Sequence, residues 1–371
     1  MIKQPKPAVL HIITKLDLGG AQKSCLALIQ ELQTQHPNYE IYLISGITGP
    51  LVPQAQTLKN VYLLPSLIWE VKLQNIFLEL QNFYHIWQIM RQLKQKHPQL
   101  IVHTHTIKAG TIGRFASLLA GVKTRIHTIH GYAFHPYQNK LVWLSFYLIE
   151  LINSLITTHF ICVSQSDLEA GCELFPNFKL KSSLIRAATT GPVQPLRPVK
   201  STGFTIGTIA NLKPGKNLFE LLRAFKLAQK SYPNLKLEII GDGPLGPAIT
   251  EQIKKLNLTE QVKLLGWVPN PQIYLQNWQT FVFTSLWEGL PCAVVEARAL
   301  NLPILAYQVG GIPDLILPEQ LYPIGSWSKL ADGIKKHYLQ IPKLHPPTLL
   351  PEFYTAKMAL DHINLYKELS L

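Results

Sequence analysis

The sequence predicts an α/β protein built from two doubly wound parallel sheets. Short apolar runs of strand length alternate with amphipathic helical patterns along the whole chain, as in successive βαβ units. The length of 371 residues exceeds what one hydrophobic core usually contains. Near the middle, Pro192, Pro195 and Pro198 lie among Gly, Thr and Ser, a composition typical of linkers. We therefore expect two Rossmann-like domains, 1–190 and 204–351, joined by a linker over 191–203.

The first domain is expected to begin with a strand at Val9–Ile13, a turn at Gly19-Gly20 and a helix from about Ala21 to Leu32. Further strands are expected at Ile41–Ser45, Leu100–His103, Arg125–Thr128 and Phe160–Val163, with helices at Leu73–Lys96 and Ile107–Ala120. The apolar stretch Leu141–Ile156 is too short to span a membrane and contains Glu150. It predicts a buried or half-buried helix, with shallow contact to a membrane surface as the alternative.

The second domain repeats the alternation after the linker. Its expected strands are Ile206–Ala210, Lys236–Ile240, Val262–Leu265, Phe281–Thr284 and Pro303–Ala306, and its expected helices are Leu218–Ser231, Leu245–Leu256 and Ala293–Leu300. The last residues, 352–371, contain the amphipathic pattern Phe353–Leu369. We expect them to form a helix that packs back toward the first domain.

The composition and net charge indicate which classes of binding partner to expect. Hydrophobic residues make up 47% and charged residues 15%, with a formal net charge of +13. Such an excess attracts nucleotide phosphates or an anionic membrane surface. Because no Lys/Arg cluster is interleaved with aromatic residues, we expect no nucleic-acid partner. The four scattered cysteines indicate a reducing compartment, and we expect a cytoplasmic protein.

Glu288 and Glu296 are the most informative pair of residues. They flank a Gly-Leu-Pro turn that follows the expected strand at Phe281–Thr284. In open α/β sheets, ligands bind beyond the carboxyl ends of the strands. Glu288 should therefore stand at the ligand crevice, with Glu296 about two turns inside the next helix. Carboxylates there accept hydrogen bonds from the hydroxyls of a sugar and a ribose, although two acids at this spacing also recur on solvated surfaces.

Two sites in the sequence are candidates for binding phosphates. Gly20 opens a helix after the first strand, where glycine permits close approach of the backbone to an anion. Lys216 lies in the loop after the first strand of the second domain, where a lysine can neutralise a diphosphate leaving group. Lys213 in the same loop is the competing candidate.

A glycine pattern and a group of histidines raise two alternatives. Gly241–Gly246 matches G-x-G-x-x-G, but no acid ends the next strand, so we interpret it as a turn and not as an NAD site. His103, His105 and His130 raise the possibility of zinc, but no acid lies between Glu79 and Glu150, and we predict no metal. Since His130 ends a strand, it can point into the crevice and contact a substrate.

In their order and spacing, several segments resemble family 4 glycosyltransferases (GT4), and most closely the bacterial enzymes that build polysaccharides and glycolipids. The segments are Thr14–Gln22, His103–Arg114, Thr128–Phe134, Cys162–Ser166, Ile240–Pro244, Glu288–Glu296 and Val309–Asp314. The resemblance covers residues 8–316 and the last helix. It implies the GT-B fold, in which two Rossmann-like domains face each other across a cleft. It also implies retention of the anomeric configuration.

The resemblance implies a role for each site residue. Glu288 would bind the donor sugar and Glu296 the ribose, Lys216 and Gly20 would hold the diphosphate, Gly289 and Leu290 would offer backbone amides, and His130 would face the donor sugar and the acceptor. Asn211 stands where such enzymes usually have an arginine, and Arg186 lies where they have Asn-Gly. Because the chain contains no D-x-D, we expect a metal-independent reaction without a cofactor.

We therefore expect transfer of a hexosyl or N-acetylhexosaminyl group from a nucleotide sugar, with UDP favoured by the Gly-Gly-Ala-Gln and His-Thr-His-Thr forms. The expected acceptor is a glycan or a polyprenyl or other lipid-linked sugar. The first domain would contact the inner face of the cell membrane peripherally. The alternatives are a non-catalytic or partner-dependent sugar-nucleotide-binding protein, motivated by Asn211, and a sugar-nucleotide epimerase.

Overall fold

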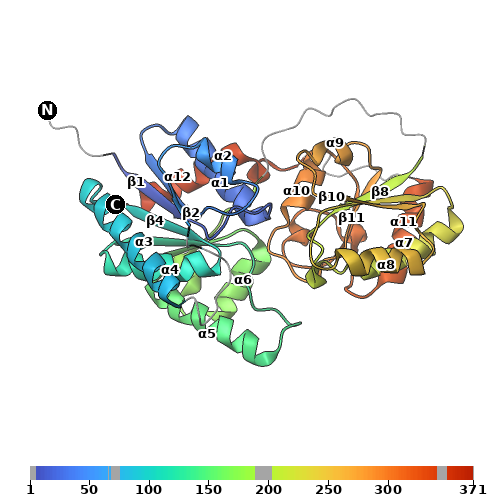
Figure 1. The fold of residues 1–371 in the computed structure, drawn as a ribbon, viewed down its shortest axis with the longest axis horizontal. Helices are drawn as coiled ribbons and strands as arrows, with labels where there is room; N and C mark the ends of the chain where they lie inside the picture. The colour runs from blue at the N-terminus through green and yellow to red at the C-terminus, as the bar shows by residue number, and fades with distance from the viewer. Residues whose placement is uncertain (1–5, 66, 68–75, 189–202, 341–348, 371) are drawn as a thin grey trace. The chain divides into compact units, whose positions relative to one another are not determined.

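The computed structural model describes residues 6–65, 67, 76–188, 203–340 and 349–370 (Figure 1). The chain divides into two compact units. The first unit comprises Met1–Ala188 and Glu352–Leu371, and the second comprises Thr189–Pro351. Apart from Gly203, the linker expected at 191–203 lies outside the described residues. Each unit is a parallel α/β structure of its own.

The first unit contains a seven-stranded parallel sheet in the order β3-β2-β1-β4-β5-β6-β7. Its strands are β1 (Ala8–Ile12), β2 (Glu40–Gly46), β3 (Val61–Leu64), β4 (Ile101–His105), β5 (Thr124–Ile129), β6 (His159–Cys162) and β7 (Ser182–Leu184). All five residues of β1 and of β4 are buried. Strands buried on both sides are typical of parallel sheets that helices cover on both faces.

Helices cover both faces of this sheet. They are α1 (Gly20–Gln35), α2 (Val52–Gln56), α3 (Ile76–Lys96), α4 (Ile107–Leu119), α5 (Lys140–Ile156), α6 (Gln165–Leu174) and α12 (Thr355–Glu368). Successive residues of a strand point to opposite faces. Val9 and Ile13 accordingly belong to the core beneath α1 and α12, while Leu10 and Ile12 belong to the core beneath α3 and α4.

The second unit contains a six-stranded parallel sheet in the order β10-β9-β8-β11-β12-β13. Its strands are β8 (Thr205–Ile209), β9 (Lys236–Ile240), β10 (Val262–Gly266), β11 (Thr280–Phe283), β12 (Ile304–Tyr307) and β13 (Leu321–Tyr322). Its helices are α7 (Leu218–Ser231), α8 (Gly246–Lys255), α9 (Gln272–Leu275), α10 (Cys292–Ala299) and α11 (Trp327–Leu339). The predicted class, two doubly wound parallel α/β sheets, is confirmed.

The expected strands and helices are present, and most of their ends agree to within one or two residues. The sequence interpretation missed the short edge strands β3, β7 and β13 and the helices α2, α6, α9 and α11. The edge strands have two to four residues, too few to show a clear alternation of apolar and polar positions.

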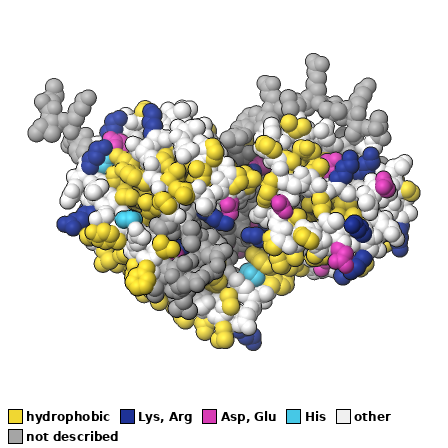
Figure 2. All heavy atoms as spheres, viewed as in Figure 1, with side chains coloured by type: hydrophobic (Ala, Val, Ile, Leu, Met, Phe, Trp, Pro, Cys, Tyr) yellow, Lys and Arg dark blue, Asp and Glu magenta, His cyan; other side chains and the backbone are white. Residues whose placement is uncertain are grey.

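Helix α5 agrees with the expectation of a buried or half-buried helix, but the residues it buries fully are polar. Glu150, Asn153 and Ser154 are buried, while Trp143, Phe146, Tyr147 and Leu151 pack partly buried against the core. Four of its leucines face outward, Leu141, Leu144, Leu148 and Leu155, and Leu141 and Leu155 are 77% and 70% exposed. Figure 2 shows hydrophobic side chains at the surface along the lower edge of the first unit, where Figure 1 draws α5. Among the described residues, no helix has the length and apolar content needed to cross a membrane.

Candidate active site

The loops after β8 and β11 meet at the switch point of the second sheet. These strands are neighbours, and the strand order runs in opposite directions on either side of them. At such a point the connections leave toward opposite faces and open a crevice at the carboxyl ends of the strands. The loop 210–217 after β8 and the loop 284–291 after β11 therefore flank the place where the fold binds ligands.

Hydrogen bonds hold these two loops together. The Leu286 backbone N–H donates to the Gly215 carbonyl at 2.8 Å. The Thr284 hydroxyl donates to the Lys216 carbonyl at 3.1 Å. A Cβ atom on Gly215 would lie 2.5 Å from the Trp287 ring, so glycine is required for this contact. The backbone that carries Lys216 is thus fixed against the backbone that leads to Glu288.

Lys216 and Glu288, predicted from separate motifs, form an ion pair. Their side chains are 25% and 14% exposed, so the pair is largely shielded but reachable from solvent. The Lys216 ammonium also lies 5.6 Å from the centre of the Phe283 ring. Since an ammonium has three N–H donors, Lys216 can bond Glu288 and a phosphate oxygen at the same time.

A third loop fixes the backbone of Glu288. The Gly311 N–H donates to the Gly289 carbonyl at 2.7 Å. Gly310 has φ +49°, and a Cβ atom on it would lie 2.1 Å from the Glu288 carbonyl oxygen. Only glycine allows this approach. Gly289 and Leu290 are buried where these loops meet.

Glu296 lies closer to the loop than expected. Helix α10 begins at Cys292, so Glu296 is its fifth residue, about one turn inside the helix and not two. Its side chain is partly exposed. Both carboxylates of the predicted pair thus belong to the loop and first turns that follow β11.

The glycine-rich turn after β9 packs against the loop that carries Asn211. Gly241 has φ +134°, and a Cβ atom on it would lie 1.9 Å from the Ala210 carbonyl oxygen. The Leu212 N–H donates to the Asp242 carbonyl at 3.0 Å. Gly241 allows the turn after β9 to pack closely against the loop after β8, which supports the interpretation of Gly241–Gly246 as a turn. Asn211 lies between the two contact points.

The switch point of the first sheet lies between β1 and β4. Gly20 begins α1 after β1, at the carboxyl edge of this sheet. Thr106 follows β4 directly and has φ +63°, an unusual conformation for a β-branched residue. Its hydroxyl lies 3.0 Å from that of Thr14, which also accepts a hydrogen bond from the Ala109 N–H at 3.2 Å. Strained backbone of this kind is concentrated at functional sites.

His130 follows β5 directly and borders a cavity of about 230 Å³ in the first unit. The lining combines apolar and polar side chains: Ala21, Thr106, Ile107, His127, Thr128, Ile129, His130, Gly131, Tyr132, Ala133, Phe134, Phe146 and Glu150. The Glu150 carboxylate is buried and lies 2.8 Å from the buried Arg114 guanidinium. Apolar walls with a few fixed polar groups are typical of sites for small organic ligands.

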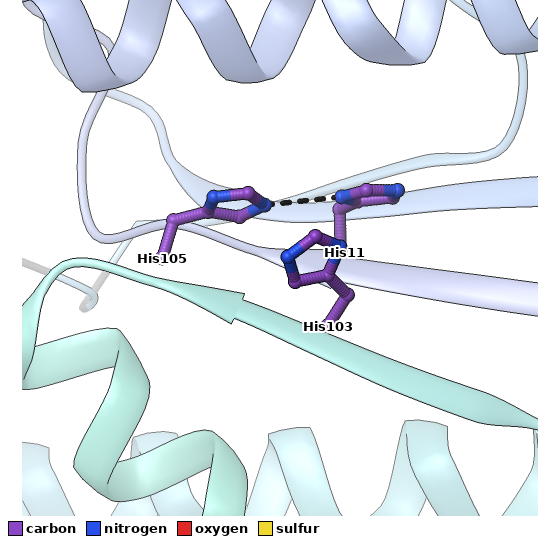
Figure 3. Close-up of side chains that lie close together, drawn as sticks. All are labelled: His11, His103 and His105. Atoms are coloured by element: carbon purple, nitrogen blue, oxygen red, sulfur yellow. Dashed lines mark hydrogen bonds between the residues drawn. The ribbon is translucent and has the colours of Figure 1, made fainter. Parts of the chain in front are cut away.

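Five imidazoles gather on the α1/α12 face of this sheet. His103 and His105 are two residues apart on β4, and His11 on β1 lies opposite His103 (Figure 3). His105 lies between His11 and His130, and His362 of α12 stacks on His103 with ring centres 5.5 Å apart. The predicted group of His103, His105 and His130 is therefore part of a larger cluster, whose members His11 and His362 the sequence interpretation missed.

Burial keeps these imidazoles neutral. Loss of hydration lowers the pKa of His11 to about 3 and the pKa values of His130 and His362 to about 4. It lowers the pKa values of His103 and His105 well below the usual value, and neighbouring imidazoles add to the effect. Near neutral pH, His130 is therefore a neutral hydrogen-bonding group and not a cation.

Comparison with known proteins decides the family. Residues 18–179 match the family described as "Glycosyltransferase Family 4", and residues 197–344 match "Glycosyl transferases group 1". The chain belongs to the GT4 family. It is therefore a retaining glycosyltransferase that transfers a sugar from a nucleotide sugar, as the sequence interpretation expected.

The relatives of this GT4 enzyme include bacterial polysaccharide enzymes. It is 28% identical, over 85% of its length and 82% of the relative's, to the Escherichia coli "UDP-Gal:alpha-D-GlcNAc-diphosphoundecaprenol alpha-1,3-galactosyltransferase". It is 25% identical to the Staphylococcus aureus "Capsular polysaccharide biosynthesis glycosyltransferase CapM", over 66% of its length and 68% of the relative's.

Two solved structures show the GT-B fold of this GT4 enzyme. One is the "lipopolysaccharide outer core galactosyltransferase WaaB apo form", with TM-score 0.73, 16% identity and coverage of 98% of this chain and 100% of that one. The other is Anabaena Alr3699/HepE in complex with UDP-glucose, with TM-score 0.75, 17% identity and coverage of 97% and 99%.

The two departures of this GT4 chain from its family pattern have different surroundings. Asn211, which the sequence resemblance places where such enzymes usually have an arginine, lies in the loop that also carries Lys216. Arg186 lies 3.4 Å from the Glu352 carboxylate, and its guanidinium lies 5.5 Å from the centre of the Phe353 ring. These contacts hold Arg186 against the segment before α12, within the first unit.

Proposed function

We propose that this GT4 enzyme transfers a hexosyl group, with galactose as the first candidate, from a UDP-sugar to a lipid-linked acceptor sugar at the inner face of the cell membrane. The main observation in support of a nucleotide-sugar donor is the Lys216–Glu288 ion pair at the switch point of the second sheet. The Escherichia coli relative, whose name specifies UDP-Gal and a diphosphoundecaprenol acceptor, supports the choice of donor and acceptor.

Positively charged and N–H groups would hold the diphosphate of the donor, and carboxylates would hold its hydroxyls. Lys216 would neutralise the diphosphate, and the backbone amides of Gly289 and Leu290 would donate to its oxygens. Glu288 would accept hydrogen bonds from the sugar hydroxyls and Glu296 from the ribose. Asn211 contributes an amide where the family pattern has a guanidinium, so Lys216 is the main cation of this loop. Gly20, which begins α1 in the first unit, remains a second candidate for contact with a phosphate.

The cavity beside His130 supports an acceptor site in the first unit. Tyr132, Phe134 and Phe146 offer apolar surface to a sugar ring, while the Glu150 carboxylate and His130 offer polar groups to its hydroxyls. Such a combination suits a sugar, which has apolar faces and a polar edge.

The reaction breaks the bond between the anomeric carbon and the UDP oxygen, and forms a bond from the same carbon to an acceptor hydroxyl oxygen. The bonding electrons leave with UDP, whose charge Lys216 stabilises. The proton of the acceptor hydroxyl passes to the leaving phosphate. Attack on the face that UDP leaves accounts for retention, and His130 contributes a hydrogen bond to the substrate.

Helix α5 supports the membrane location. Its exposed apolar side chains recur along the helix at Leu141, Leu144, Leu148, Ile152 and Leu155. A continuous exposed apolar surface marks a site of contact with a membrane or a protein. The net charge of +13 favours an anionic lipid surface as the partner.

Turnover on defined substrates tests the proposal. Purified protein would be incubated with radiolabelled UDP-galactose, UDP-glucose or UDP-N-acetylglucosamine and with a polyprenyl-diphosphate-linked N-acetylglucosamine, and the lipid product would be counted. We expect product with one UDP-sugar and none with Glu296→Ala, in which calorimetric UDP binding should also be lost. UDP binding without product on any acceptor would instead favour the non-catalytic alternative that Asn211 motivates.

Vesicle binding tests the α5 surface. The double substitution Leu141→Asn and Leu155→Asn removes two exposed apolar side chains without touching the cavity. We expect it to lower cosedimentation with vesicles of phosphatidylglycerol and phosphatidylethanolamine by tenfold or more, because each buried leucine contributes about 1.5–3 kcal/mol. Leu339→Asn is the matched control, since Leu339 is 73% exposed at the end of α11. Equal binding by all three proteins would contradict a role for α5.

A further inference from the structure

Three histidines of this cluster, His11, His105 and the partly exposed His130, are joined in a series of hydrogen bonds that begins at His130. His130 Nε2 lies 3.1 Å from His105 Nδ1, and His105 Nε2 lies 3.1 Å from His11 Nδ1. The strand register explains the alignment. His105 lies opposite Thr128 on β5, so His130, two residues further, continues the same face toward the carboxyl edge. Figure 3 shows the second of these hydrogen bonds, between His105 and His11.

The protons of such a chain are coupled. A neutral imidazole carries one N–H, so it donates at one nitrogen and accepts at the other. If His105 donates from Nδ1 to His130, it must accept at Nε2 from His11 Nδ1–H. If His105 donates from Nε2 to His11, it must accept at Nδ1 from His130 Nε2–H. The tautomer of His11 therefore determines the tautomer of His130, two hydrogen bonds away.

His11, at the end of the hydrogen-bonded series, distinguishes the two arrangements: in the first, His105 donates to His130, and in the second, His105 donates to His11. His11 is fully buried, and its Nε2 has no hydrogen-bond partner among the residues that the structure describes. In the second arrangement this atom carries a proton, which leaves a buried N–H unsatisfied. In the first arrangement it is a bare acceptor. Orphaned buried N–H groups are rarer in folded proteins than under-satisfied acceptors, so the first arrangement is favoured.

We propose that His11 and His105 are positioning residues that hold His130 as a single tautomer, with the proton on Nδ1. Nε2 of His130 is then occupied as the acceptor from His105. The hydrogen bond that His130 offers to a ligand is the donor Nδ1–H. Its use in catalysis rests on the proposed role of His130 in sugar transfer, whereas the tautomer itself follows from the hydrogen bonds within the first unit.

His103 stands apart from the chain. Its Nδ1 lies 2.7 Å from the Tyr366 hydroxyl, and its Nε2 lies 2.6 Å from the Thr128 hydroxyl. One nitrogen each of His11, His103 and His105 lie within 4.8 Å of one another, a spacing that can hold a metal ion. An ion there would have to replace one hydrogen bond of His103 and one of His105, because both nitrogens of each ring are hydrogen-bonded. The hydrogen-bonded chain accounts for the geometry without that loss.

Nitrogen NMR of the whole protein tests the proposal. With histidine labelled by nitrogen-15, two-bond proton–nitrogen correlations report which ring nitrogen carries the proton. We expect a protonated Nδ1 and a bare Nε2 at His11, His105 and His130. A protonated Nε2 at any of the three would overturn the assignment. About one equivalent of bound zinc, with signals that shift on chelation, would overturn it in favour of a metal site.

A variant tests the coupling over distance. His11→Phe keeps an aromatic ring but removes the end of the chain. We expect His130 to populate both tautomers in this variant, and kcat to fall on the order of tenfold while the KM for the UDP-sugar is unchanged. His337→Phe is the matched control, because His337 is a buried histidine of the second unit bonded to Thr280.

An unchanged His130 signal in folded His11→Phe would overturn the coupling. If His11→Phe does not fold, the tautomers measured by NMR in the unmodified protein still test the assignment of the Nδ1 proton. If the protein transfers none of the tested sugars, the proposed function fails, while the tautomer pattern is measured independently of turnover.

Discussion

Replacing Lys216 with alanine is expected to lower kcat about 100- to 1,000-fold, the effect of removing one preorganised group that stabilises developing negative charge. Asn211 occupies the position where the sequence resemblance expects an arginine, so Lys216 is the cation of this loop that pairs with Glu288, whereas Lys213 is exposed. The variant also leaves the shielded Glu288 carboxylate without its ion-pair partner, close to the expected diphosphate. Steady-state kinetics with the active UDP-sugar would measure the loss.

Lys213→Ala is the matched control. Lys213 precedes Lys216 by three residues in the same loop, and its side chain is exposed. Its replacement removes the same formal charge but no contact with Glu288, so kcat should change less than threefold. A comparable loss in both variants would assign the effect to the general positive potential of the loop and contradict a specific role for Lys216.

Acidification is expected to unfold the first unit before the second. His11, His130 and His362 have pKa values lowered by burial to about 3, 4 and 4, whereas in the unfolded chain they titrate near 6.5. The unfolded state therefore binds more protons below pH 6.5. The stability associated with neutral histidines is complete above pH 6.5 and is lost as pH falls toward 4.

The expected loss is large. A shift of two or more pKa units corresponds to on the order of 3 kcal/mol for each histidine. Three such residues approach the total stability of an ordinary domain, about 5–15 kcal/mol. In the described part of the second unit, His337 is the one histidine with a comparable shift, to about 4. The second unit should therefore retain its structure to lower pH.

Hydrogen exchange with mass spectrometry at pH 7 and at pH 4.5 would separate the two units, because each peptide belongs to one of them. We expect β1, β4 and β5 to lose protection at pH 4.5, while β8 and β11 keep it. Loss of protection in the second unit first, or in both at the same pH, would show that the buried histidines do not control acid stability.

The sequence by itself determined the fold class and predicted that Lys216 and Glu288 follow strands of the same sheet. Alternation of apolar strands and amphipathic helices is a local pattern, and it predicts parallel α/β sheets wherever the chain continues. Lys216 and Glu288 each follow a strand, and the carboxyl ends of parallel strands share one edge. Their shared edge was therefore predictable, although 72 residues separate them.

Their pairing was decided only by the tertiary structure. Strand order placed β8 beside β11, and the hydrogen bonds of Thr284 and Leu286 then brought the two loops into contact. The orientation of α5 was likewise not readable from its composition. Leucines on a helix indicate burial in general, but most leucines of α5 face outward, while Glu150 and Asn153 are buried, where they bond Arg114 and Thr111.

The histidine chain shows most clearly what the sequence alone cannot show. His11 lies 94 residues from His105 in the chain, and a histidine within an apolar run gives no local sign of a partner. Register between β1 and β4 set His11 beside His103, two residues from His105, and α12, from the far end of the sequence, placed His362 and Tyr366 against His103. Local patterns specify which residues form strands and helices. Which polar groups meet inside the core depends on strand order and register, and these are set by the packing of the whole unit.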